Sequence, residues 1–170
     1  LVATGAWTGR LLQEAGLALP IRPVRGQMIL FRAPPGLVSR ILLCRGRYVI
    51  PRRDGHVLAG STVEETGFDK TTTTTAGREL HAAAVRLVPA LDGMEVVGHW
   101  AGLRPGAPGG VPYIGEHPQV RGLFVCSGHY RNGIVLGPAS ARLATDLMLD
   151  RPPLLDPTPY ALVRETIIRP

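Results

Sequence analysis

A short apolar run, a polar loop with two glycines and a helical pattern follow one another at residues 123–149 and constrain the fold more than any other stretch. The apolar run at 123–127 predicts a buried strand. Gly128 and Gly133 allow tight backbone geometry and the close approach of a ligand. The first main-chain N–H groups of a helix have no intrahelical partner and carry partial positive charge. The stretch is therefore interpreted as a cradle for an anion or a cofactor, and the alternative is a plain strand-to-helix turn.

Turn signals elsewhere divide the chain into short strand patterns. Asp54-Gly55 lies between two of them, 47–51 and 56–63, and Asp-Gly is typical of a β-hairpin. Because hairpin-linked strands pair antiparallel, the sequence predicts an α+β fold, with a largely antiparallel mixed sheet and flanking helices. Further strands are predicted at 24–33, 38–44, 94–104 and 113–114, and helices at 6–15, 77–87, 133–149 and 160–165.

Some local details accompany this pattern. Thr75 is predicted to cap the helix at 77–87, and residues 105–110 to lack regular structure because they are rich in proline and glycine. His99 is expected to face away from Arg104 and to have a structural role. The helix that follows Gly133 is predicted to bury a face made of Leu136, Ala139, Leu143 and Leu147.

The composition indicates one globular domain with a basic surface. The 170 residues are 45% hydrophobic, which is enough for a real core, and the formal net charge is +6. The basic residues are spaced out, and no arginine-rich arm or nucleic-acid motif accompanies them, so no nucleic-acid partner is expected. Their charge suits an acidic small molecule or an ordinary solvated face. Seven of them cluster early in the chain: Arg22, Arg25, Arg32, Arg40, Arg45, Arg47 and Arg52.

The cysteines and the chain start bear on the setting of the protein. Cys44 and Cys126 are far apart, lack metal-site spacing and lie in apolar runs, so both are expected to be buried free thiols. Without a signal peptide or an 18-residue apolar run, a cytoplasmic protein with no membrane contact is expected. The chain starts at Leu1 without a methionine, in what resembles the end of a strand, and is therefore expected to be a fragment that begins inside a fold.

Three residues are candidates for chemistry. Arg104 ends a predicted strand beside a glycine and before a Pro-Gly loop, and a guanidinium binds a carboxylate bidentately. Arg131 lies with His129 and Asn132 in the polar loop and offers donors to an anion. Tyr48 lies in a predicted strand. The alternatives are a surface ion pair for Arg104, helix capping for Arg131 and packing for Tyr48.

The familiar catalytic motifs are missing from the sequence. It contains no Gly-x-Ser-x-Gly, His-Glu-x-x-His, Cys-x-x-Cys, Walker loop or Gly-x-Gly-x-x-Gly, and no paired carboxylates in an apolar context. It therefore supplies no nucleophile or base of the ordinary kind, and no metal site is expected. A cofactor that accepts a hydride would make such a nucleophile or base unnecessary.

Seven stretches, in order, resemble the C-terminal half of the FAD-dependent D-amino-acid oxidase superfamily, and within it the glycine oxidase group of bacterial thiamine biosynthesis. Each stretch is weakly specific alone, and the ordered set is strongly specific. The stretches are Val2-Ala3-Thr4-Gly5-Ala6-Trp7, Pro23-Val24-Arg25-Gly26-Gln27, Tyr48-Val49-Ile50-Pro51-Arg52, Gly60-Ser61-Thr62, Trp100-Ala101-Gly102-Leu103-Arg104-Pro105, Pro112-Tyr113-Ile114-Gly115 and Gly128-His129-Tyr130-Arg131-Asn132-Gly133-Ile134.

The resemblance implies residue roles. Arg104 is similar to the family arginine that holds the amino-acid carboxylate over the flavin, Tyr48 to the active-site tyrosine of the substrate domain, and Arg131 to a second active-site arginine. These three are the expected catalytic and substrate-binding residues. The expected FAD-binding residues are Gly5, His129, Tyr130, Arg131, Asn132, Gly133, Ile134 and Val135.

The resemblance also implies a reaction. The substrate, which is glycine, sarcosine or a small D-amino acid, gives a hydride from its α-carbon to the flavin, the imine is released, and oxygen reoxidises the flavin to give hydrogen peroxide. A sarcosine oxidase or dehydrogenase, and a carboxylate-binding module without catalysis, remain as alternatives. Many relatives carry an acid in the loop after Arg-Pro, whereas residues 107–110 here contain none, which leaves the substrate preference open.

The resemblance finally implies a domain organisation. Residues 1–20 are expected to end the FAD-binding domain, 21–120 to form the substrate-binding domain, 121–150 to return to the FAD-binding domain, and 151–170 to form a tail. The N-terminal half is the expected missing partner, so FAD is not expected to stay bound to this chain alone. Apolar surface at residues 1–7 and around Val125 is expected to be exposed and to drive homo-oligomerisation.

Overall fold

The computed structural model describes residues 1–163 and divides the chain into two compact units. The sheet unit is Arg25–Leu103, and the terminal unit joins Leu1–Val24 to Arg104–Pro170. The chain passes between the units inside two long strands, β1 (Arg22–Arg32) and β5 (Val96–Gly106). The predicted helix at 160–165 extends beyond the described residues.

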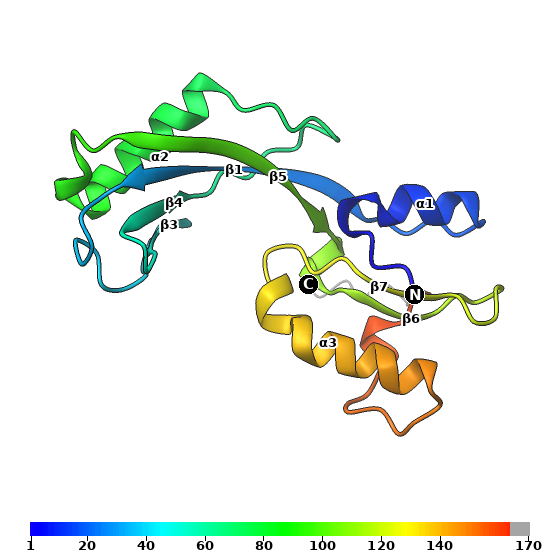
Figure 1. The fold of residues 1–170 in the computed structure, drawn as a ribbon. Helices are drawn as coiled ribbons and strands as arrows, with labels where there is room; N and C mark the ends of the chain where they lie inside the picture. The colour runs from blue at the N-terminus through cyan, green and yellow to red at the C-terminus, as the bar shows by residue number, and fades with distance from the viewer. Residues whose placement is uncertain (164–170) are drawn as a thin grey trace. The chain divides into compact units, whose positions relative to one another are not determined.

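The sheet unit contains a five-stranded sheet in the order β2-β3-β4-β1-β5. The three strands not yet bounded are β2 (Leu42–Cys44), β3 (Arg47–Pro51) and β4 (His56–Gly60). Antiparallel pairs join β2 to β3, β3 to β4 and β4 to β1, and Figure 1 shows β1 and β5 running in opposite directions. The predicted α+β fold with a largely antiparallel sheet is thereby confirmed.

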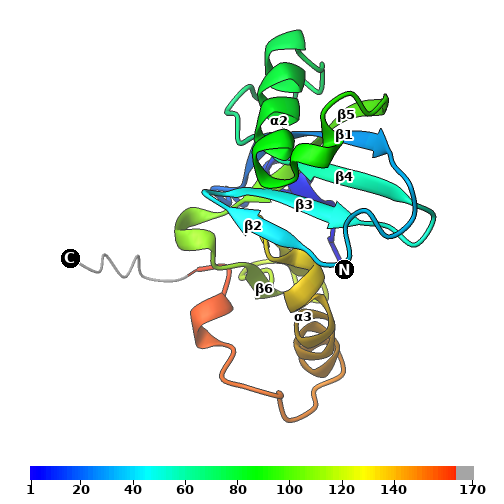
Figure 2. The ribbon, with the colours of Figure 1, turned by 90° about the vertical axis from the view of Figure 1, so that its left-hand side faces the viewer.

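One helix, α2 (Thr74–Leu87), packs on one face of this sheet, and the short 3₁₀ helix η2 (Pro89–Leu91) follows it (Figure 2). The helix buries Leu80 and Ala84 against apolar side chains that point to the same face. Alternate residues of the strands supply that face because successive side chains of a strand point to opposite sides. The buried strand residues of this core are Ile29, Phe31, Val49, Val57 and Ala59.

The prediction that Thr75 caps this helix is wrong by two residues. The cap is Thr73, whose backbone is extended and whose Oγ1 accepts a hydrogen bond of 3.3 Å from the N–H of Ala76. Thr75 already lies in the first helical turn, whereas a capping residue stands just before the helix and its side chain accepts from an N–H two or three residues further on. A run of five threonines offers several equivalent caps, and the local sequence alone does not select among them.

Three predicted strand boundaries are also wrong. The strand expected at 38–44 is only the three residues of β2. The strand expected at 56–63 ends at Gly60, which is opposite Met28. Beyond it the register with β1 shifts by one residue to Arg25 opposite Glu64, with the Thr62 N–H donating to Gln27 O (3.3 Å) and the Glu64 N–H to Arg25 O (3.0 Å). Pro105 and Gly106, expected to be irregular, continue β5, which lies at the edge of the sheet where proline is tolerated.

The terminal unit is built around a two-stranded antiparallel sheet. Its strands are β6 (Tyr113–Glu116) and β7 (Phe124–Ser127), and Val2 pairs in parallel with Val125 on β7. The remaining elements are η1 (Gly5–Trp7), α1 (Thr8–Glu14), η3 (Pro108–Gly110), α3 (Gly133–Met148) and η4 (Thr158–Tyr160).

Two apolar clusters cover the two faces of this small sheet. Leu12 of α1 packs with Tyr113 and Val125, whereas Leu143 of α3 packs with Ile114. The predicted buried face of α3 is only partly right. Leu143 is buried as predicted, but Ala139 is exposed, and the helix also buries Ser140, Ala144 and Asp146.

The expected apolar surface is only partly exposed. Leu1 and Trp7 are 59% and 45% exposed, but Val125 is fully buried because the strand-like segment at Val2 lies beside it. The expectation for the cysteines is wrong for Cys44, which is exposed near the end of β2, and Cys126 is half-buried. Within residues 1–163, no helix is both long and apolar enough to cross a membrane.

Candidate functional site

The polar loop between β7 and α3 is fixed to the end of β5. Gly106 and His129 form an antiparallel bridge, and the Tyr130 N–H donates a hydrogen bond of 3.0 Å to Pro105 O. Gly128 has φ +89°, and an added Cβ would lie 3.0 Å from the Ala107 side chain, so this position requires glycine. Long-range contacts, not the loop sequence alone, therefore set the loop conformation.

Tyr130 occupies an unusual backbone conformation inside this loop. Its φ is +50°, a left-handed value that is uncommon for a residue other than glycine. The hydrogen bond to Pro105 O holds the residue in that conformation. Such conformations persist only where surrounding contacts determine them, and they cluster at functional sites.

The start of α3 presents apolar side chains together with the first backbone N–H groups of the helix. Ile134 and Val135 are 96% and 83% exposed. Asn132 precedes the helix, and its side chain does not cap the first N–H groups. These groups carry partial positive charge. An apolar surface beside such donors fits a flat aromatic ring that carries negative charge.

His129 attaches the loop to the body of α3. Its Nε2 is 2.9 Å from Oγ of Ser140, which is buried in the helix. Burial lowers the pKa of His129 below its ordinary value, so the neutral imidazole is favoured. This contact joins the loop to α3 and occupies Nε2 of the ring.

The structure brings Arg104 and Arg131 into one unit. Arg104 is half-buried near the end of β5, two residues before the bridge to His129. Arg131 is exposed in the loop itself, and residues 1–163 provide it with no hydrogen bond or ion pair. The two guanidinium groups belong to segments that are bonded to each other through their backbones.

Gly5 lies in the same unit and is held by a short chain of hydroxyl groups. Its carbonyl accepts a hydrogen bond of 3.2 Å from Ser127 Oγ on β7, and that oxygen accepts one of 2.8 Å from Thr8 Oγ1. Gly5 has φ +56°. The expected cofactor residues Gly5 and 129–135 therefore share the terminal unit.

Tyr48 is the one predicted site residue in the sheet unit. It lies on β3, and its side chain points to the face of the sheet opposite α2, since the neighbouring Val49 belongs to the core under that helix. Its hydroxyl is 3.8 Å from the sulfur of Met28. Gly60 entered the sequence analysis only within the stretch Gly60-Ser61-Thr62 and without a role, and the structure places it opposite Tyr48 across β3 and β4. An isolated glycine in a strand was the available signal.

A second feature missed from the sequence is a buried charge network around Arg25. The guanidinium bonds to Glu64 and Asp69, each at 2.6 Å, and to Thr71 O at 2.9 Å. These bonds, that to Glu64 foremost, raise the pKa of Arg25. Burial raises the pKa of Glu64, but hydrogen bonds from Thr62, Arg25 and Gln27 outweigh it and leave the pKa below its ordinary value.

The network has a structural role. It is fully paired, and with Gln27 it ties the loop after β4 to β1: Gln27 Nε2 donates to Glu64, and its Oε1 accepts from the Thr73 N–H (2.9 Å). His99 Nε2 is 3.0 Å from the same Oε1, in agreement with its predicted structural role. Of the seven early arginines, Arg25 and Arg32 form ion pairs, and Arg47 bonds to Ser61 O.

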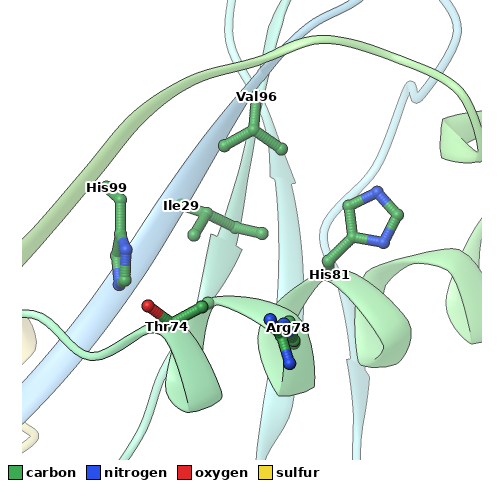
Figure 3. A pocket seen from close by; sticks show the side chains of 7 residues that line it. Ile29, Thr74, Arg78, His81, Val96 and His99 are labelled. Atoms are coloured by element: carbon green, nitrogen blue, oxygen red, sulfur yellow. The ribbon is translucent and has the colours of Figure 1, made fainter.

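A groove lies between α2 and the edge of the sheet (Figure 3). Its volume is about 520 Å³, and Figure 3 shows the imidazole of His99 extending from β5 towards Thr74 at the start of α2. None of the predicted catalytic or cofactor residues lines this groove. Within the described residues, no cluster of three or more histidine, cysteine or carboxylate side chains could hold a metal ion.

Known proteins share the sequence and the fold of this chain. Residues 1–147 match the sequence profile of the family described as FAD dependent oxidoreductase. The chain belongs to that family.

Among its relatives, a glycine oxidase from Pseudomonas aeruginosa is 56% identical over 161 residues, 95% of this chain and 44% of that protein. The crystal structure of glycine oxidase from Geobacillus kaustophilus matches 96% of this chain and 44% of its own, with a TM-score of 0.91 and 38% identity. The crystal structure of iminodiacetate oxidase from Chelativorans sp. BNC1 matches 94% of this chain and 44% of its own, with a TM-score of 0.88 and 27% identity. The chain thus spans under half the length of these relatives.

Proposed function

We propose that this chain supplies the substrate-binding sheet and the flavin-facing loop of an FAD-dependent amine oxidase of the glycine oxidase type. Its substrates would be glycine, sarcosine or small D-amino acids, and its products the imine and hydrogen peroxide. The identity to glycine oxidases supports this proposal. The observation that carries it is the backbone attachment of the Arg104 segment to the exposed loop that precedes α3.

In this proposal the arginines bind the anionic end of the substrate. Arg104 forms a bidentate contact with the carboxylate, which is the one strong handle of a small zwitterion that does not react. Arg131 provides a second positive charge, and Tyr48 contributes its ring and hydroxyl from the sheet unit. Fixing the carboxylate orients the α-carbon as well as binding the molecule.

The loop and the start of α3 would hold the flavin ring, through Gly5 and residues 129–135. The flavin, when bound, supplies the hydride acceptor that the side chains lack. Ile134 and Val135 would exclude water from its apolar surface, and the uncapped N–H groups of α3 would stabilise negative charge beside it.

FAD is not expected to stay bound to the 170-residue chain alone. FAD affinity in such folds comes largely from the pyrophosphate bound at a Rossmann helix, and the sequence contains no Gly-x-Gly-x-x-Gly motif. Purified alone, the chain should therefore be colourless. A stoichiometric flavin absorbance that survives gel filtration would contradict this expectation.

Expression of the complete reading frame tests the proposed function. The purified protein should be yellow and should release hydrogen peroxide with glycine, sarcosine or D-alanine. A flavin that reduces a dye but produces no peroxide would indicate the dehydrogenase alternative. A protein that binds these amino acids without flavin would indicate a carboxylate-binding module and would refute the proposal.

A further inference from the structure

Tyr48, Gly60 and Met28 form a row across three adjacent strands. Tyr48 of β3 is paired with Gly60 of β4, and Gly60 is paired with Met28 of β1. Directly paired residues project to the same face of a sheet, here the face without α2. Because Gly60 has no side chain, the middle position of the row is vacant, and the phenol of Tyr48 bends across it until its hydroxyl reaches the sulfur of Met28 at 3.8 Å.

Space beside the Tyr48 ring limits the side chain at this position. Gly60 is not among the glycines with positive φ, and its peptide bond to Ser61 is cis. An added Cβ would, however, lie 2.9 Å from Cε2, 2.9 Å from the hydroxyl oxygen and 3.0 Å from Cζ of Tyr48. All three atoms belong to the far end of one side chain, so a methyl group at Gly60 would displace the ring and leave the strands in place.

Among residues 1–163, no strong polar contact holds the Tyr48 ring in this position. The thioether of Met28 is a weak hydrogen-bond acceptor, and the separation of 3.8 Å is long. The flat position of the phenol over β4 therefore depends on the vacant space at Gly60. A small change at Gly60 should move the ring further than a change at Met28.

We infer that Gly60 is a positioning residue that seats the Tyr48 ring over β4, where the ring meets the substrate. The second half of this inference rests on the proposed function, in which Tyr48 contributes to substrate binding. A displacement of about 1 Å at an active-site group costs up to about 100-fold in rate. The Gly60→Ala variant should consequently fold normally and lose about 10- to 100-fold in kcat/KM for glycine.

The test uses the flavin-loaded protein from the complete reading frame, labelled with 3-fluorotyrosine. The ¹⁹F line of Tyr48 is assigned by its loss in Tyr48→Phe. Gly60→Ala should shift this line while the melting temperature stays close to that of the parent. Gly102→Ala is the matched control, because it adds the same methyl group to a strand glycine with nothing within 4 Å of the new Cβ. It should leave the Tyr48 line in place.

A double-mutant cycle separates positioning from a general structural effect. In the Tyr48→Ala background there is no ring to displace, so Gly60→Ala should lower kcat/KM by less than about twofold. If Gly60→Ala lowers kcat/KM equally in the parent and in the Tyr48→Ala background, the inference is overturned. A ¹⁹F line of Tyr48 that does not shift in Gly60→Ala would overturn it as well. A shifted line with unchanged kcat/KM would overturn the link to the substrate. If the protein oxidises no amine, the proposed function fails, and the ¹⁹F line alone decides whether Gly60 seats the ring.

Discussion

Arg25 in the sheet unit and Arg131 in the terminal unit have opposite surroundings, although arginine side chains are usually exposed. Arg25 is 4% exposed, and each of its three guanidinium nitrogens donates to Glu64, Asp69 or Thr71 O. Arg131 is exposed on a loop whose backbone is fixed by distant contacts. A fully paired buried charge has no capacity left for a ligand, whereas a charge on a fixed loop does. Pairing therefore separates structural from candidate binding arginines.

Replacement of Arg104 should produce the largest effect. A charge-assisted bidentate contact is worth about 2–4 kcal/mol, so Arg104→Ala in the full-length protein should reduce kcat/KM for glycine by roughly 30- to 1000-fold. Arg104→Lys keeps the charge but loses the planar fork, and its efficiency should fall between. The measurement is steady-state peroxide production.

The control for Arg104 is Arg121→Ala, which removes an exposed arginine near the turn before β7 and should leave the efficiency unchanged. If Arg104→Ala stays within about threefold of the parent while folded and flavin-loaded, the carboxylate ligand is not Arg104. Arg131 then becomes the candidate ligand of the carboxylate. The contrast between the paired Arg25 and the exposed Arg131 still holds.

Removal of the Arg25 partner should have the next largest effect, on stability and not on binding. Glu64→Ala takes away a carboxylate bonded to Arg25, Gln27 and Thr62 and leaves a buried guanidinium short of a partner. We expect the melting temperature to fall by roughly 6–12 °C.

The matched control for Glu64 is Glu95→Ala. Glu95 pairs with Arg32 at 2.7 Å, but both side chains are more than 60% exposed, so its loss should change the melting temperature by about 1 °C or less. Equal effects of the two substitutions, measured by differential scanning calorimetry, would remove the distinction between the buried network and a surface pair.

The free energy of unfolding should depend on Thr73 at the start of α2 and not on Thr75, two positions further along the chain. Thr73→Ala removes the cap and the contact with Gln27, and should lower the free energy of unfolding by about 1 kcal/mol. Thr75→Ala should be neutral or slightly stabilising, because alanine has the higher helix propensity. Urea denaturation measures both, and the reverse ranking would identify Thr75 as the cap.

The smallest predicted effect is a pH dependence centred on His129. Because burial lowers its pKa in the folded chain below the ordinary 6.5, the unfolded chain binds the proton first as the pH falls. The contribution of the neutral ring to stability is therefore complete above about pH 6.5 and is lost progressively below it.

Comparison of His129→Gln with the parent checks this dependence. The loss of stability between about pH 7.5 and pH 5 should be smaller in the variant. The carboxylates with lowered pKa, such as Glu64, lose their contribution only at lower pH, since their folded pKa values lie below the ordinary 4.5. If the stability of His129→Gln changes with pH as much as that of the parent, the bond between His129 and Ser140 does not depend on the charge of the ring.

Local patterns in the sequence determined the elements whose signals are short-range. The Asp54-Gly55 turn between β3 and β4, the run that becomes β7 and the helix starting at Gly133 are present as predicted. Neighbouring residues set turn type, strand alternation and helix periodicity, so these signals need no distant partner. The same reasoning identified the loop at 128–132 as the most informative stretch.

Contacts between residues far apart in the sequence decided the rest. Glu64 lies 39 positions from Arg25. Their ion pair buries Arg25, one of the seven early arginines whose charge suited an acidic small molecule or an ordinary solvated face. The choice of Thr73 as cap depends on Gln27, 46 positions away. The sequence assigns Gly60 no role of its own until the pairing of β3 with β4 places it against Tyr48. Residues adjacent in the sequence do not determine these contacts, because the contacts form only when the strands and the helix have packed.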